Sequence, residues 1–344
     1  MYGEIDVRYD IEIAFPKHIW IELTNICNSR CLFCAHRKMS RKRSEINPNL
    51  YKRILQEAAR EGVKKIGLFA NGEPFISKNL AEYIRLAKNI GIEYVYITTN
   101  GTLATKERLI EVIESGLDSI KFSINAGSEE TYELVHGISG FNKVKENIRF
   151  LYDYRGKTKK IFNIFITFVV TKYTEDELDK FEKEFSVFAD GILFVKAERQ
   201  SCCFSFDEFE RFRCKGLNKD VFEDKSSYDK ICRYPFMKLL VSCEGYLTPC
   251  GNDFQNSLAV ADLNKISLKE AWNCDTLKKL RKVHIDGNLD NTLCYNCRNS
   301  ESRKVEPLCP ELWTEFDTDM ILDGGETIAR VTQYLKKVDI RKNG

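Results

Sequence analysis

The sequence has no long apolar segment and no excess of charge of either sign. Its longest apolar run, residues 161–170, is interrupted by Asn163 and Thr167, whereas a membrane-spanning helix needs about 20 apolar residues. Lys and Arg total 53 against 51 for Asp and Glu, and this net charge of +2 gives no electrostatic footprint for nucleic acid or an anionic membrane. The N-terminus also lacks the basic and then apolar layout of a signal peptide. We therefore expect a cytoplasmic protein with no nucleic-acid or membrane partner.

Cysteine, in contrast, is abundant. The chain of 344 residues is long enough for about two domains, and its 43% hydrophobic and 30% charged residues are typical of a globular protein with a sizeable core. There are 13 cysteines, and in a reducing cytoplasm such residues are metal ligands or catalytic groups more often than disulfides. Three lie near the N-terminus and ten lie from residue 202 to residue 309, which predicts two cysteine-bearing modules.

Strand-like and helix-like segments alternate over the first 196 residues. Between the apolar strand-like segments, residues such as Leu50, Ile54 and Ala58 recur at helical spacing. This alternation predicts a parallel sheet with crossover helices, and six repeats fit either a partial (β/α)6 barrel or a doubly wound sheet. The predicted strands are residues 19–24, 65–69, 94–99, 119–124, 162–170 and 192–195.

The alternation stops after Lys196, and a different pattern follows. Two short apolar segments, residues 237–242 and 246–249, flank a Glu-Gly pair and predict a hairpin. One continuous helix is predicted over residues 267–284, where apolar residues recur on one face. The predicted organisation is a barrel-like domain over residues 1–198, a linker over 199–229, an auxiliary domain over 230–310 and a helical tail over 311–344.

Three cysteines follow directly on the first predicted strand: Cys27, Cys31 and Cys34. Three thiolates in one loop hold three irons of a 4Fe–4S cube and leave the fourth iron open to an outside ligand, whereas ferredoxins supply a fourth cysteine. A zinc site made of these cysteines and His36 is one alternative, although His36 follows Cys34 more closely than paired zinc ligands usually do. A trio of buried core cysteines is the other.

This C-x3-C-x2-C pattern, with Phe33 before the last cysteine, resembles the signature of the radical S-adenosylmethionine (SAM) superfamily. The resemblance implies an α/β fold built as a partial TIM barrel, a 4Fe–4S cluster on Cys27, Cys31 and Cys34, and SAM bound to the open iron through its amino and carboxylate groups. In that family an electron passes to the sulfonium, and the resulting 5′-deoxyadenosyl radical abstracts hydrogen from the substrate. Phe33 would lie near the adenine.

A second motif, Asn71-Gly72-Glu73-Pro74, follows the second predicted strand and resembles the Gly-Glu-Pro motif of the same family. In the family this motif binds the methionyl amino group of SAM. The chemistry suits the role, because Gly72 allows a close backbone approach and the Glu73 carboxylate accepts hydrogen bonds from an ammonium. We therefore expect residues 71–74 to bind SAM.

Polar residues also end the third and fourth predicted strands: Asn100, and then Ser123 and Asn125. Barrel enzymes place their ligand-binding groups at these carboxyl ends. The resemblance implies that Ser123 and Asn125 bind the SAM ribose. As turn formers, Asn100 and Asn125 also have a purely structural interpretation.

Four later cysteines are the predicted ligands of a second cluster: Cys232, Cys250, Cys294 and Cys297. A zinc ribbon would also use two pairs, but normally with C-x2-C on both sides. The stretch resembles the C-terminal SPASM domain of radical SAM enzymes in its shortened Twitch form, a β-hairpin plus helix with one auxiliary 4Fe–4S cluster, as in an aminocyclitol dehydrogenase of the butirosin pathway. Because four thiolates saturate such a cluster, we expect it to transfer electrons.

Six cysteines have no predicted partner: Cys202, Cys203, Cys214, Cys243, Cys274 and Cys309. A free cysteine is usually a small buried hydrophobe. Cys202 and Cys203 follow the last predicted strand of the barrel, and Cys243 and Cys309 flank the auxiliary domain. These four are candidates for a thiol that donates hydrogen to a substrate radical in an epimerisation.

The predicted function is therefore a radical SAM oxidoreductase or epimerase that acts on a small polar molecule such as a sugar or aminocyclitol. By resemblance, flavodoxin or ferredoxin is its reductant. Modification of a ribosomal peptide is the alternative, although peptide-modifying relatives often have an N-terminal leader-binding domain and fewer than 20 residues precede the predicted barrel. A non-catalytic iron–sulfur or zinc protein would leave the motifs at residues 72–74 and 123–125 unexplained.

Overall fold

The computed structural model describes residues 9–200, 203–214, 231–289 and 293–299. Within these residues, nine strands form one sheet in the order β6-β5-β4-β3-β2-β1-β7-β8-β9. No helix among them is long and apolar enough to cross a membrane. The predicted helical tail over residues 311–344 lies outside the described residues.

The first six strands are parallel, and each pairs with the next one along the chain. In a doubly wound sheet, some strands are added on one side of the first strand and the rest on its other side. Here the six strands follow one another in chain order, which identifies the partial barrel and confirms that prediction. The strands are β1 (His18–Ile21), β2 (Lys65–Gly67), β3 (Tyr94–Thr99), β4 (Ser119–Ser123), β5 (Asn163–Val170) and β6 (Gly191–Lys196).

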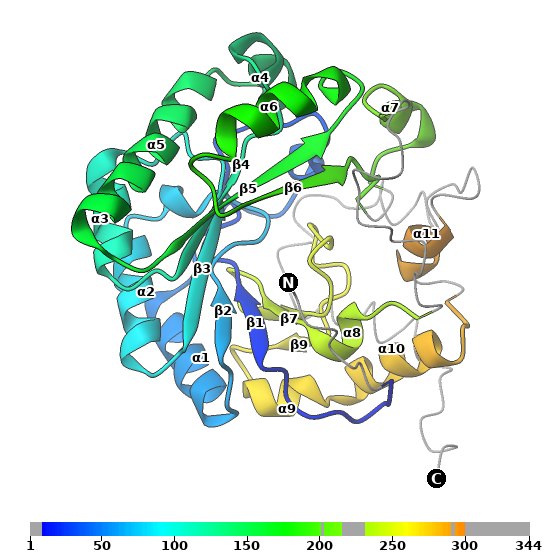
Figure 1. Cartoon of the computed structure of the whole chain (residues 1–344). Helices are drawn as coiled ribbons and strands as arrows, with labels where there is room; N and C mark the ends of the chain where they lie inside the picture. Colours follow the sequence, from blue (N-terminus) through cyan, green and yellow to red (C-terminus); the bar gives the residue numbers. More distant parts are fainter. Residues whose placement is uncertain (1–8, 201–202, 215–230, 290–292, 300–344) are drawn as a thin grey trace.

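Helices cover the outer face of this curved sheet (Figure 1). They are α1 (Pro48–Arg60), α2 (Leu80–Asn89), α3 (Lys106–Glu114), α4 (Glu129–His136), α5 (Phe141–Thr158) and α6 (Leu178–Phe185), with short 3-10 turns η1 (Ala35–Lys38), η2 (Pro74–Ile76) and η3 (Glu175–Glu177). Helix α1 shows why they form: the Asn47 side chain caps it by accepting from two backbone amides, and Pro48 occupies its first turn.

Side chains alternate between the two faces of each parallel strand. On β3, Val95 and Ile97 point outward and are fully buried against the helices, while Tyr94, Tyr96 and Thr98 are half-buried on the opposite face. We call this opposite face, away from α1–α6, the inner face (Figure 1). The main core therefore lies between sheet and helices, and the inner face is left for polar and aromatic side chains.

The C-terminal part continues the same sheet. Strand β7 (Leu239–Val241) pairs parallel with β1, and β8 (Tyr246–Thr248) and β9 (Ala261–Asp262) follow antiparallel. The predicted hairpin is confirmed, with Gly245 at φ 95° in its turn. The remaining helices are α7 (Phe206–Glu210), α8 (Tyr234–Met237), α9 (Leu268–Trp272), α10 (Asp275–Ile285) and α11 (Leu293–Asn299).

The helix predicted over residues 267–284 is instead two helices, α9 and α10. The chain leaves helical geometry at Asn273 and Cys274, and Arg281 stabilises the break. Its guanidinium donates to the Trp272 carbonyl at 2.9 Å and to the Asn273 side-chain oxygen at 2.8 Å. A tertiary contact thus satisfies the carbonyl that a continuous helix would have used.

Candidate functional site

The loop of Cys27, Cys31 and Cys34 lies between β1 and η1, at the carboxyl ends of the parallel strands. Two backbone hydrogen bonds dock it on the end of α4: Arg30 N donates to the His136 carbonyl at 2.8 Å, and Leu32 N donates to the Val135 carbonyl at 2.9 Å. All three cysteine residues are half-buried, and their thiols lie in the interior of the site. The barrel and the end of α4 therefore hold the loop in place.

The three thiols lie close enough to affect one another. Burial, together with the Glu73 carboxylate and Cys34, raises the pKa of the Cys27 thiol to about 11. Burial also raises the pKa of Cys31, with contributions from Cys34 and Cys27, and it raises the pKa of Cys34. Thiols in such surroundings become thiolates only beside a cationic centre, as metal ligands do.

The predicted Gly-Glu-Pro segment packs directly on this loop. A Cβ atom at Gly72 would lie 2.1 Å from the Thr24 carbonyl oxygen, so only glycine fits there. The next amide, Glu73 N, donates to the Ile26 carbonyl at 2.8 Å. Pro74 is buried and begins η2. The residue before the glycine, Asn71, donates to the Glu22 carboxylate through its backbone and its side chain, at 3.2 and 3.0 Å.

The Glu73 carboxylate is buried and joins the ends of two strands. It accepts hydrogen bonds from Phe75 N at 3.0 Å, from Thr99 Oγ1 at 2.7 Å and from Asn100 N at 2.7 Å. Burial raises the pKa of Glu73, and these donors partly oppose the change. Each carboxylate oxygen can accept more than one hydrogen bond. The carboxylate therefore fixes the site's framework and keeps capacity for a further donor.

Asn100 stands next to the first cysteine. Its side-chain amide donates to Asn28 Oδ1 at 2.9 Å and lies 4.0 Å from Cys27 Sγ. Its Oδ1 accepts from the backbone and hydroxyl of Thr102, at 3.0 and 2.7 Å. The turn that the sequence suggested for Asn100 is therefore present, and the residue also lies beside Cys27.

Ser123 and Asn125 meet at the end of β4. Asn125 has φ 57°, in the left-handed region, and its amide donates to Ser123 Oγ at 3.0 Å. Its Oδ1 accepts from Val169 N on β5 at 2.7 Å. Asn125 thus links β4 to β5, and Ser123 lies on the inner face, where its hydroxyl keeps a proton to donate.

Sequence reasoning missed His136, which ends α4. Its Nδ1 lies 3.4 Å from Cys31 Sγ, and its Nε2 contacts the Ile124 carbonyl oxygen. The ring stacks on Tyr132 at 4.0 Å between centroids. Burial lowers the pKa of His136 to about 4, so the ring is neutral. No local pattern marks this histidine, since only the docking of the cysteine loop on α4 brings it to Cys31.

Phe33 and Cys203 share a second apolar cluster beside the loop. Phe33 is 8% exposed and packs there with Cys31 and Cys34 at its edge, and Cys203 is 7% exposed. Two other predicted thiol donors, Cys202 and Cys309, lie outside the described residues. The fourth, Cys243, lies in the turn of the β7–β8 hairpin.

The four later cysteines also come together. Cys232 precedes α8, Cys250 follows β8, and Cys294 and Cys297 lie one turn apart on α11. Burial raises the pKa of the Cys294 thiol, and Cys250, Cys232 and Cys297 raise it further. The glycine after Cys250 approaches the inner face, since a Cβ at Gly251 would lie 2.4 Å from the Trp20 ring. This second thiol group is therefore built next to β1.

Comparison with known proteins agrees with this geometry. The family model of the radical SAM superfamily matches residues 21–185, and that of the SPASM iron–sulfur cluster-binding domain matches residues 232–298. These matches identify a radical SAM domain in residues 21–185 and a SPASM domain in residues 232–298. An uncharacterised protein of Methanocaldococcus jannaschii is 31% identical over 54% of this chain and 59% of its own length. The chain spans about half the length of the curated relatives it matches.

Two solved structures show the same fold. BtrN in complex with AdoMet and 2-DOIA has a TM-score of 0.54 and 17% identity, over 81% of this chain and 91% of BtrN. Streptococcus suis SuiB bound to the precursor peptide SuiA has a TM-score of 0.59 and 17% identity, over 77% of this chain and 66% of SuiB. The radical SAM assignment implies SAM and a 4Fe–4S cluster, and the SPASM domain implies an auxiliary cluster.

The cysteines of this radical SAM protein fit iron–sulfur clusters better than zinc. Four thiolates around one zinc ion lie about 3.8 Å apart, given a Zn–S bond of about 2.3 Å. Among the described residues, only Glu22, Cys243 and Glu244 bring three ligand atoms within 4.8 Å of one another. Neither cysteine group is drawn around a single ion, as expected if each thiolate holds a different iron.

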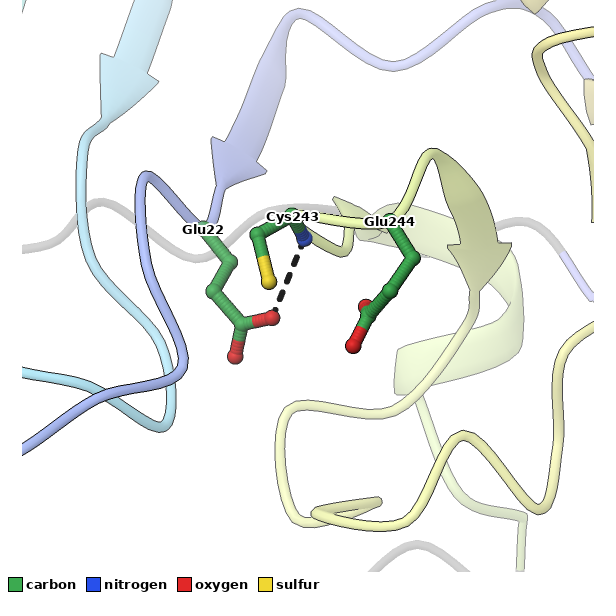
Figure 2. A group of neighbouring side chains, drawn as sticks. All are labelled: Glu22, Cys243 and Glu244. Atoms are coloured by element: carbon green, nitrogen blue, oxygen red, sulfur yellow. Dashed lines mark hydrogen bonds between the residues drawn. The ribbon is translucent and has the colours of Figure 1, made fainter. Parts of the chain in front are cut away.

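The exception, Glu22 with Cys243 and Glu244 (Figure 2), is not a metal site in this radical SAM protein. The Arg41 guanidinium already lies among the three side chains. It pairs with Glu22, donates to Glu244 Oε2 at 2.5 Å and lies 3.6 Å from Cys243 Sγ. The cation that the two carboxylates require is therefore an arginine, and Cys243, 3% exposed, belongs to this buried network.

Proposed function

We propose that this chain is a radical SAM oxidoreductase that acts on a small polar molecule. Cys27, Cys31 and Cys34 would hold the SAM-binding cluster. The observation that supports the proposal is that these three half-buried cysteines lie at the carboxyl ends of the barrel strands, within a framework built by Glu73 and Asn100. A merely structural cysteine loop would not need the close approach at Gly72.

The chain's own residues would bind and orient SAM. The segment of residues 71–74 lies against the cysteine loop, where a carbonyl or carboxylate oxygen can accept from an ammonium group. Ser123 faces inward at the end of β4 and can donate to a ribose oxygen. Phe33 would contribute an apolar wall close to Cys34. When bound, the cluster supplies the electron that cleaves SAM to a 5′-deoxyadenosyl radical, which takes a hydrogen atom from the substrate.

Cys232, Cys250, Cys294 and Cys297 would hold the auxiliary cluster. Four thiolates leave it no open iron, so its role would be to accept the electron that remains on the substrate after hydrogen removal. Its position beside Trp20 on the inner face supports that role. The two described candidates for a thiol donor, Cys203 and Cys243, are both buried in core clusters, and this favours oxidation over epimerisation. Flavodoxin or ferredoxin is the reductant we propose.

Two substrate classes occur on this fold. BtrN was solved with 2-DOIA and shares 91% of its length with this chain, whereas SuiB was solved with a peptide and shares 66%. The fuller overlap supports a small molecule, and peptide modification is the second candidate. Solvent deuterium separates the possible reactions: an epimerase incorporates one deuterium per turnover, whereas a dehydrogenase releases an oxidised product without it.

The decisive experiment is anaerobic reconstitution followed by reaction with SAM and dithionite. We expect about eight irons per chain for two clusters, and 5′-deoxyadenosine as product. Cys27→Ala should lose about half of the iron and all SAM cleavage, whereas Cys250→Ala should lose about half of the iron and keep cleavage in the absence of substrate. Cys274→Ala, a cysteine outside both groups, is the matched control and should keep both. SAM cleavage in Cys27→Ala at the wild-type rate, or zinc in place of iron, would refute the proposal.

A further inference from the structure

Three lysines face one another on the inner face of the barrel. Lys65 begins β2, Lys121 lies in the middle of β4, and Lys238 directly precedes β7. The strand alternation puts Lys65 and Lys121 on the side away from the helices, and Lys238 lies over the Trp20 ring on the same side. Strand order brings them together from distant parts of the sequence, because β7 pairs with β1 and β1 pairs with β2.

A group of three aromatic rings lies between these lysines. The ring of Phe69 lies 5.5 Å from Trp20 and 5.4 Å from Tyr96, between centroids. The rings gather above Gly67, where an added Cβ would lie 2.8 Å from all three. We call Trp20, Phe69 and Tyr96 the aromatic floor.

Each ammonium lies over a different ring of the aromatic floor. Lys65 Nζ is 5.1 Å from the Tyr96 centroid, Lys121 Nζ is 5.9 Å from Phe69, and Lys238 Nζ is 4.3 Å from Trp20. Cation–π contacts of this kind hold an ammonium in place while they leave its hydrogen-bond donors free. The three charges are thus fixed around one shared surface.

The described carboxylates neutralise neither Lys121 nor Lys238. No described carboxylate forms an ion pair or hydrogen bond with Lys121 or Lys238. His18 is close, but burial, with help from Lys238 and Lys65, lowers its pKa to about 3, so it adds no charge. Burial, together with Lys121 and Lys65, lowers the pKa of Lys238 to about 8. Mutual repulsion of this kind is relieved when an anion binds between the cations.

Two of the three lysines lie near residues already assigned to the proposed sites. Lys238 is near enough to Cys250 for that thiolate to raise its pKa in part, and Lys121 shares its face of β4 with Ser123. A group held by the lysines would therefore sit beside both the SAM-binding residues and the auxiliary cysteines, as a substrate must if it is to react with the one and pass an electron to the other.

We propose that Lys65, Lys121 and Lys238 bind an anionic group of the substrate, a carboxylate or a phosphate, over the aromatic floor. This inference rests on the proposed radical SAM function and narrows its substrate to a negatively charged molecule. A carboxylate and a phosphate would be bound in the same way, because each presents anionic oxygens that accept hydrogen bonds from several ammonium groups.

The test uses the reconstituted full chain under anaerobic conditions and calorimetric titration with three probes. Inorganic phosphate and succinate represent the two anion classes, and succinamide is the neutral match for succinate. We expect one or both anions to bind and succinamide not to bind. Lys121→Met and Lys238→Met keep the length of the stem and should weaken anion binding about tenfold or more, whereas Lys121→Arg should retain most of it. Lys52→Met, on the exposed side of α1, is the matched control and should change nothing.

A second measurement on the wild-type protein does not depend on the variants. Limited acylation of lysines followed by mass spectrometry should show that the effective anion protects Lys121 and Lys238, and that it leaves Lys52 unprotected. SAM affinity and 5′-deoxyadenosine formation are measured in the same preparations. If SAM cleavage is intact and neither anion binds or protects, the inference is wrong while the proposed function stands. If the lysine variants weaken SAM binding instead, the lysines belong to the SAM site and the inference is equally overturned.

Discussion

Arg41 is the residue whose loss should destabilise this protein most clearly. It joins Glu22, which follows β1, to Glu244 in the hairpin turn of the auxiliary domain, and the side chains of Arg41 and Glu22 are 2% and 0% exposed. The network includes Asn25 and Asn256, whose amides donate to Glu244 at 3.1 and 3.2 Å. The segment after the cysteine loop is thereby tied to the C-terminal strands.

The size of the expected loss of stability follows from the burial of Arg41 and Glu22. Arg41→Met keeps most of the side-chain volume but leaves Glu22 fully buried without its cation, and breaking a buried pair in this way costs about 3–5 kcal/mol. For 344 residues, an unfolding entropy of about 2.1 cal/mol/K per residue converts this cost into a fall in Tm of roughly 4–7 °C. Glu244 is only partly buried, so Glu244→Gln should cost less, and the two changes should be non-additive in a double-mutant cycle because they remove the same contact.

The assay is urea unfolding of the anaerobic protein followed by circular dichroism. The matched control is the exposed pair of Lys64 and Glu93, with 56% and 62% exposure, where Lys64→Met should cost about 0–1 kcal/mol. If Arg41→Met shifts the midpoint no more than Lys64→Met does, the reasoning that the buried network stabilises the junction is refuted.

Three further predictions test other parts of the structure. Gly72→Ala should displace the cysteine loop from the Thr24 carbonyl, so reconstituted protein should retain about half of its iron by chemical analysis. His18, whose pKa falls from 6.5 to about 3 on folding, stays neutral in the folded protein while the unfolded chain takes up a proton, so stability should drop by about 2 kcal/mol from pH 7 to pH 5. His18→Gln should flatten that part of the pH profile in urea titrations. Although burial opposes the effect, Arg41 lowers the pKa of Glu244 below 4.5. The contribution of Glu244 to the free energy of unfolding should therefore be present above pH 4.5 and lost on further acidification. Glu244→Gln should not show this loss.

Much of the barrel could be predicted because strand and helix periodicity is local. The strand predicted over residues 94–99 matches β3 residue for residue, and the other five differ by a few residues at their ends. Periodicity could not choose between a barrel and a doubly wound sheet, because it does not record on which face each helix packs. That choice came from the family resemblance, and strand order confirms it.

The break between α9 and α10 shows a different limit. The capping box of Ser267 and Glu270 marks where α9 begins, and it can be found from sequence. The end of α9 has no such local sign, because Arg281 reaches back from α10 to satisfy the Trp272 carbonyl. A contact between two turns of different helices decides the boundary, so apolar spacing alone predicts one helix where the chain forms two.

Some features of the candidate site could likewise be predicted from local sequence, and others depend on tertiary packing. Cysteine spacing and the Gly-Glu-Pro segment are contiguous in sequence and could be recognised there, whereas His136 and the Arg41 network depend on which elements pack together. The lysines of the inner face are the strongest case. A net charge of +2 averages the whole surface and hides a local excess, and each lysine alone resembles any solvated one. Only the register that sets β2, β4 and β7 on one curved sheet concentrates three ammonium groups over one aromatic surface, so the proposed anion site depends on strand pairing and not on composition.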